Sequence, residues 1–187
     1  PCTAVDTCGC RIPPRVWVGE RDANTVPFDI ASGRFEGNSG GYLVVAAASG
    51  LVFSRQQGAS FGPGPVPLVN PRITRVAAAS LDPEADAFRG GPSRDDVAWT
   101  APEACVRGVG FQTACPIVRE LEDPGGCFGV YASDGVTSLA GGDAQCWRYD
   151  LPLPARDVCT GDFDGNGAND AAVATSGNSV LLFLGDG

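Results

Sequence analysis

The sequence predicts an all-β fold of short antiparallel strands, cross-linked by disulfides and almost without helix. The chain of 187 residues contains 26 glycines and 15 prolines, and only 19% of its residues are charged. It also contains eight cysteines but no histidine or methionine. Frequent glycine and proline favour turns between short strands. A hydrophobic fraction of 43% is sufficient for a buried core.

The net charge of −9 restricts the expected partners. Nucleic acids and anionic membrane surfaces repel such a chain at neutral pH, so cations are the expected small ligands. The longest apolar run, residues 42–48, is far shorter than the ~18 residues that a membrane-spanning helix needs. We therefore expect a soluble chain that is not inserted in a membrane.

The even number of cysteines, in a chain that does not begin with methionine, predicts disulfides and an extracellular, secreted or cell-surface protein. A zinc site is the less favoured alternative, because the chain has no CxxC pair and no histidine. We expect one disulfide between Cys105 and Cys115. A second would join Cys127 to Cys146, and Cys159 would reach a cysteine near the N-terminus. Eight cysteines allow 105 connectivities, so other pairings remain open.

An internal repeat at an offset of 128 residues organises the chain. SGRFEGNSGGYLVVA (residues 32–46) aligns with TGDFDGNGANDAAVA (residues 160–174), with Gly, Phe, Gly, Asn, Val and Ala in register. In each copy, two apolar strands joined by a tight turn complete the unit. A degenerate copy at residues 76–101 keeps an acidic loop between two strands. The Cys-bearing region 105–146 is expected to be an insertion in surface loops.

The loop DFDGNGAND, residues 162–170, has the oxygen spacing of a calcium site. Side chains at loop positions 1, 3, 5 and 9 and a main-chain carbonyl at position 7 can converge on one hard cation. The predicted ligands are Asp162, Asp164, Asn166, Asp170 and the carbonyl of Ala168. Calcium is favoured over magnesium, because a flexible loop with many oxygens suits a cation of loose geometry. The alternative is an Asx-rich turn that caps backbone N–H groups without a metal.

The segment GDFDGNGANDAAVATSGNSVLLFLGDG, residues 161–187, resembles the FG-GAP/VCBS repeat of integrin-like β-propellers. Residues 30–54 and 76–100 resemble that repeat less closely. The resemblance implies antiparallel four-stranded blades of β-propeller type, each with an acidic loop. It divides the chain into a Cys-rich segment, 1–15, and about three repeats within 16–187, approximately 16–60, 61–134 with an insertion, and 135–187.

The acidic loops of the other two copies differ from the calcium-type loop. In the first copy, Arg34 and Tyr42 occupy the positions of Asp162 and Asp170, so this loop is expected to have lost its ion. The Arg34 guanidinium could instead pair with Glu36. The middle copy has carboxylates at irregular spacing: Asp82, Glu84, Asp86, Asp95 and Asp96. A solvated acidic loop is favoured there over a second calcium site.

Aromatic side chains are expected in the core. Phe35 and Phe163, which occupy the same loop position in two copies, are predicted to pack between neighbouring units. Trp17 and Trp99 lie in apolar strand-like segments and are predicted to be buried. Trp147, beside a cysteine, is the tryptophan for which an exposed, sugar-stacking role is the strongest alternative.

The absence of histidine argues against an enzyme, because it removes Ser-His-Asp and Cys-His arrangements and the commonest general base. A glycosidase-type carboxylate pair remains as an alternative without a recognisable placement. Three units are too few to close a β-propeller, so exposed strand edges predict a structural module that associates with other chains or copies, in a fibre or on a surface. The alternative function is carbohydrate binding or adhesion.

Overall fold

The computed structural model describes residues 27–35, 42–48, 50–57, 60–63, 72–81, 95–107, 115–131 and 146–185. These residues form β-strands and no helix, which confirms the predicted all-β fold. Nothing in this part of the chain forms a helix with the length and apolarity needed to cross a membrane. The Cys-rich segment 1–15 and Trp17 lie outside the described residues.

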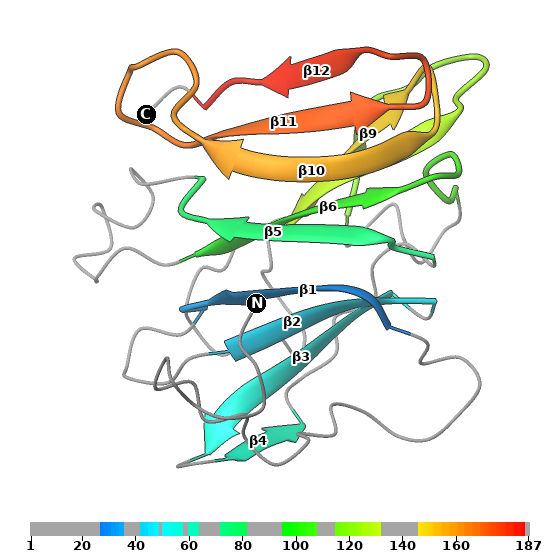
Figure 1. Ribbon diagram of the computed structural model, residues 1–187. Helices are drawn as coiled ribbons and strands as arrows, with labels where there is room; N and C mark the ends of the chain where they lie inside the picture. Colours follow the sequence, from blue (N-terminus) through cyan, green and yellow to red (C-terminus); the bar gives the residue numbers. More distant parts are fainter. Residues whose placement is uncertain are drawn as a thin grey trace, which may run out of the picture.

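The strands form three open sheets (Figure 1). Sheet A has the order β1 (Pro27–Gly33), β2 (Tyr42–Ala47), β3 (Gly50–Gln57) and β4 (Ser60–Pro63). Sheet B has the order β5 (Arg75–Ala79), β6 (Asp96–Ala101), β8 (Gly126–Tyr131), β9 (Cys146–Leu151) and β7 (Ile117–Arg119). Sheet C has the order β10 (Ala155–Gly161), β11 (Asp170–Thr175) and β12 (Val180–Phe183). The described strands do not close a propeller, and only sheet A has four strands.

The repeat in the sequence coincides with a repeated hairpin. In sheet A, β1 and β2 are antiparallel, with Gly33 opposite Tyr42. In sheet C, β10 and β11 are antiparallel, with Gly161 opposite Asp170. The partners match along the whole of both hairpins at the offset of 128 residues, including a register shift near the start of β1 and β10. The similar residues of the two segments therefore occupy the same positions in two sheets.

The hairpin of β5 and β6 in sheet B keeps the same loop closure. Ala79, the last residue of β5, lies opposite Asp96. Asp96 Oδ2 accepts the N–H of Leu81 at 2.8 Å. In sheet C, Asp170 Oδ2 accepts the N–H of Phe163 at 2.7 Å. The acidic residue that begins the second strand thus fixes the start of the loop in both hairpins.

The matched registers define two equivalent faces on each sheet. The front face of each sheet carries the third residue of its second strand. These residues are Val44 in sheet A, Ala98 in sheet B and Ala172 in sheet C. The opposite side is the back face, which carries Trp99 in sheet B and Val173 in sheet C. These definitions allow the packing of the three sheets to be compared directly.

Sheet B is covered on both faces, because it lies between sheets A and C (Figure 1). Val44 and Phe53 on the front face of sheet A share a core with Trp99 on the back face of sheet B. Ala98 on the front face of sheet B shares a second core with Val173 on the back face of sheet C. The sheets therefore stack in one direction, front face onto back face, at both interfaces.

A similar polar contact also occurs at both interfaces. Asp95, the residue before β6, accepts the N–H of Arg34 at 2.6 Å through Oδ2 and donates its own N–H to the Arg34 carbonyl at 2.9 Å. Asn169, the residue before β11, donates its side-chain amide to the carbonyl of Ser80 at 2.9 Å. Arg34 and Ser80 each follow the first strand of their sheet. The polar contact between sheets B and C therefore joins positions equivalent to those that join sheets A and B.

The disulfide pairing predicted from spacing is wrong. The structure joins Cys105 to Cys127 and Cys115 to Cys146. The pairing of β6 with β8 brings Cys127 opposite Ala101, close to the segment that contains Cys105. The parallel pairing of β7 with β9 brings the residues that follow Cys115 beside those that follow Cys146. Strand pairing, rather than closeness in the sequence, decides which thiols meet.

The region 105–146 is also more than a surface insertion. It contains β8, a buried strand in the centre of sheet B, with Cys127 and Phe128 fully buried. It also contains β7, whose parallel pairing with β9 departs from the predicted purely antiparallel sheets. Cys159 is exposed and has no disulfide partner among the described residues. Its predicted link to an N-terminal cysteine lies outside them.

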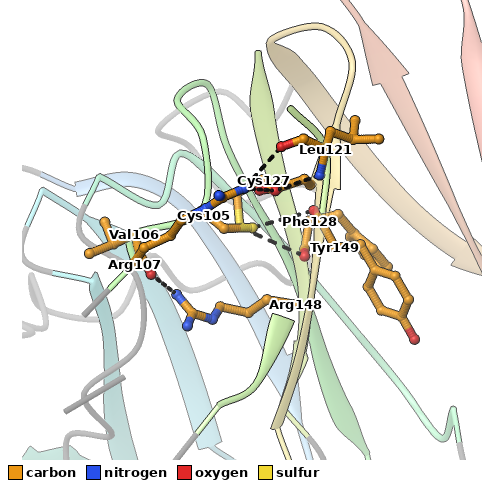
Figure 2. Close-up of polar contacts among 9 residues, drawn as sticks. Cys105, Val106, Arg107, Leu121, Cys127, Phe128, Arg148 and Tyr149 are labelled. Atoms are coloured by element: carbon orange, nitrogen blue, oxygen red, sulfur yellow. Dashed lines mark hydrogen bonds and ion pairs between the residues drawn. A yellow bond between two sulfur atoms is a disulfide. The ribbon is translucent and has the colours of Figure 1, made fainter. Parts of the chain in front are cut away.

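A buried arginine, which the sequence analysis did not single out, holds the disulfide-bonded segment against sheet B (Figure 2). Arg148 Nε donates to the Cys115 carbonyl at 2.7 Å, and Nη1 donates to the Val106 carbonyl at 2.6 Å. Burial lowers the pKa of Arg148, and the negative charge of Asp150 opposes that shift. Carbonyl groups thus replace the water that the guanidinium loses.

Asp150 is held by Arg107 and Leu121 from the same segment. Arg107 Nη2 donates to Asp150 Oδ2 at 2.7 Å and to the Leu121 carbonyl at 3.0 Å. The Leu121 N–H also donates to Asp150 Oδ2, at 3.1 Å. Together with the two disulfides, these contacts join residues 105–107 and 115–121 to β8 and β9.

Candidate metal centre

The predicted calcium loop connects β10 to β11 at one end of sheet C. Because Gly161 lies opposite Asp170, the two ends of the loop lie side by side. Gly165 and Gly167 have φ angles of +81° and +90°, in the left-handed region that glycine adopts without steric cost. These two glycines let the backbone wind tightly enough for side chains of the loop to point inward.

Three of the five predicted ligands form a carboxylate cluster. One oxygen each from Asp162, Asp164 and Asp170 lies within 4.8 Å of the other two. Calcium binds oxygen at 2.3–2.6 Å, so ligands on opposite sides of the ion are about 4.6–5.2 Å apart. The three oxygens therefore fit within one calcium coordination sphere. No second cluster of this kind occurs in the part of the chain that the structure describes.

The exposed carboxylates of this cluster also fix the backbone of the loop. Asp162 accepts the N–H of Gly165 at 2.7 Å and that of Gly167 at 3.0 Å. Asp164 accepts the N–H of Asn166 at 3.0 Å. A carboxylate has about four lone-pair sites, so these bonds leave acceptor capacity for a cation. The hydrogen bonds of the metal-free alternative are thus present, and they are compatible with a bound ion.

Asp170 is the buried member of the cluster. Its two oxygens accept the N–H of Gly185 at 2.8 Å and that of Phe163 at 2.7 Å. These hydrogen bonds, that of Gly185 first, lower the pKa of Asp170 below its ordinary value, although desolvation opposes them. Asp170 is therefore ionised at neutral pH, the form that binds a metal. It also joins the loop to the segment that follows β12.

Asn166 and Ala168, the other two predicted ligands, participate in the fold of the loop. Asn166 Oδ1 accepts the N–H of Ala168 at 2.7 Å, and Nδ2 donates to the Gly185 carbonyl at 2.7 Å. Ala168 is buried. The loop is thus tied to Gly185 through Asn166 as well as Asp170. A cation held here would stabilise both the β10–β11 connection and the end of β12.

The corresponding loops of sheets A and B lack this cluster within the described residues. Arg34 is exposed, and its main chain bonds to Asp95 of sheet B. Asp96 closes the loop of sheet B through the Leu81 N–H. The other acidic residues considered for these loops lie outside the described residues: Glu36, Asp82, Glu84 and Asp86.

The aromatic predictions are confirmed in part. Phe35 is 1% exposed in the core shared by sheets A and B. Trp99 is fully buried there, and Trp147 is half-buried. The prediction for Phe163 is wrong, since this side chain is 48% exposed. Phe35 is buried on the side where sheet B packs on sheet A, whereas no described sheet covers the front face of sheet C.

The chain matches no protein-family model, and no curated protein is significantly similar to it in sequence. The fold and the site together define an all-β, disulfide-bonded protein with a loop of converging carboxylates.

Proposed function

We propose that this protein is an extracellular, calcium-stabilised structural module of β-propeller type, which associates with other chains or with copies of itself and is not an enzyme. The observation that carries the proposal is the repeated stacking of sheets A, B and C, front face onto back face. In such tandem arrays, each unit is stabilised mainly by its neighbours. The two end units therefore keep surfaces and strand edges that are suited to association.

Two further observations support parts of this proposal. Disulfides such as Cys105–Cys127 and Cys115–Cys146 are typical of oxidising, extracellular environments. The carboxylates of Asp162, Asp164 and Asp170 repel one another unless a cation or protons neutralise them. A calcium ion would remove this repulsion and join both ends of the β10–β11 loop. Its role would be to stabilise sheet C rather than to activate a substrate.

Calcium is expected to raise the melting temperature of the protein, because a ligand that binds only the folded state stabilises it by mass action. At a free calcium concentration 100-fold above Kd, the stabilisation is about 2.7 kcal/mol. Excess chelator should reverse the shift. The measurement is thermal unfolding followed by circular dichroism, with calcium and with chelator.

The double substitution Asp162→Asn, Asp164→Asn tests whether the response arises in this loop. It keeps side chains of similar size but removes two of the three clustered charges, and should abolish the calcium-dependent shift. Glu122→Gln is the matched control, because it neutralises an exposed carboxylate outside the cluster and should leave the shift intact. An unchanged melting temperature in calcium and chelator would refute the calcium part of the proposal.

The competing glycan-binding function is distinguished by a different experiment. The purified chain is tested on a glycan array, and its mass in solution is measured in parallel. A structural module should associate without retaining glycans. A monomer that binds one class of glycan would instead identify the protein as a ligand-binding module.

A further inference from the structure

The front face of sheet C exposes large apolar side chains. Val180 and Leu182 of β12 lie on this face, opposite Ala174 and Ala172, and are 63% and 56% exposed. Phe163, in the adjoining loop, is 48% exposed. A solvent-exposed apolar face of this kind is unusual in an isolated soluble domain and marks an interaction surface.

The same positions of sheet A are buried by a neighbouring sheet. Phe53 lies opposite Val44 as Leu182 lies opposite Ala172, so Phe53 and Leu182 are equivalent. Phe53 is 1% exposed, because sheet B covers the front face of sheet A. Phe35, the equivalent of Phe163, is covered in the same core. The exposed front face of sheet C is therefore equivalent to the face of sheet A that sheet B covers.

The back face of sheet A shows the complementary difference. Ile30 in sheet A, Val76 in sheet B and Val158 in sheet C occupy equivalent positions on the first strand of their sheets. Each lies opposite the fourth residue of the second strand: Val45, Trp99 and Val173, respectively. Val76 and Val158 are 6% and 7% exposed, because the preceding sheet covers them. Ile30 is 55% exposed. Among the described residues, Ile30 is thus exposed where its equivalents in sheets B and C are buried, although its cross-strand partner Val45 is 6% exposed.

We propose that the front face of sheet C binds the back face of sheet A of a second copy of this chain. This inference rests on the proposed assembly function and names its partner. The contact would repeat the stacking of sheet A on sheet B and of sheet B on sheet C. In Figure 1 these three sheets lie one above another. Ile30 of one copy and Leu182 of the other would belong to one shared core, as Val76 and Phe53 do within one chain.

Two copies joined at both ends would bring together six of the described sheets, three from each chain. Closed propellers typically contain four to eight blades, so six sheets are compatible with closure. A head-to-tail contact that closes after two copies gives a discrete dimer rather than a fibre.

The test is the mass of the full chain in solution, measured by light scattering during size-exclusion chromatography in calcium. The wild-type protein should have twice the mass of one chain. Leu182→Asp and Ile30→Asp should each reduce it to the monomer mass, because each places a charge at the proposed contact. Val118→Asp is the matched control: Val118 is 57% exposed but lies on β7, away from both end faces, and this variant should remain dimeric.

Circular dichroism of each variant shows whether it is folded, which is expected because the replaced side chains are exposed. A monomeric wild-type protein would overturn the docking proposal. So would a dimer that survives either Leu182→Asp or Ile30→Asp in the folded state. A monomer whose melting temperature still rises with calcium would overturn only the docking and leave the calcium-stabilised module standing.

Discussion

Substitution of Trp99 by alanine is expected to lower the free energy of unfolding by about 3–5 kcal/mol, the usual cost of removing a large buried aromatic side chain. Trp99 is fully buried in the core shared by sheets A and B. Its ring lies directly on Gly129 of β8, since a Cβ added to Gly129 would approach the ring to 2.1 Å. A domain is typically stable by only about 5–15 kcal/mol, so the loss would be a large fraction of the total.

The effect is measured by urea unfolding followed by circular dichroism. Trp147→Ala is the matched comparison, because Trp147 is half-buried and its removal should cost clearly less. Equal losses for the two substitutions would contradict the position of Trp99 at the centre of the A–B core. The comparison therefore tests the packing of sheet A on sheet B.

Replacing both cysteines of either disulfide by serine should lower the free energy of unfolding by about 3–4 kcal/mol, from the loop-entropy estimate for these separations. Cys105 and Cys127 are 22 residues apart in the sequence, and Cys115 and Cys146 are 31 apart. The two disulfides fasten the segment between β6 and β8 to β8 and to β9, respectively. Reduction should accordingly make this segment the first to be cut in limited proteolysis.

The measurement again is urea unfolding, with the connectivity established first by mass spectrometry of non-reduced peptides. The peptide map should contain Cys105 linked to Cys127 and Cys115 linked to Cys146. A link between Cys105 and Cys115 would contradict the strand pairing of sheet B, because that pairing brings these cysteines to different partners.

The repeated hairpins could be predicted because their information is local. The repeat at an offset of 128 residues includes the apolar strands and the glycine at the loop entrance, and the strand registers match at the same offset. The carboxylate cluster could also be predicted, since alternate positions of a tight loop bring Asp162, Asp164 and Asp170 together once the two strands pair.

The errors concern contacts between distant segments. The disulfides depend on β6 pairing with β8 and on β7 pairing with β9, which spacing between cysteines does not reveal. Phe163 was predicted to be buried because Phe35 has the same place in the repeat. Whether this phenylalanine is buried depends on whether another sheet packs over it, and the local sequence does not contain that information. Arg148 likewise becomes recognisable only when carbonyls from another segment surround it.

Calorimetric titration of calcium into the metal-free protein tests the central claim most directly. We expect one ion per chain, with a Kd of about 0.1–1 mM, the range of extracellular calcium modules. The binding heat should disappear in the Asp162→Asn, Asp164→Asn variant. Magnesium titrated at the same concentration should give no comparable binding heat. Absence of binding up to about 10 mM calcium, tenfold above that range, or undiminished binding by the double variant, would contradict the assignment of the carboxylate cluster as a calcium site.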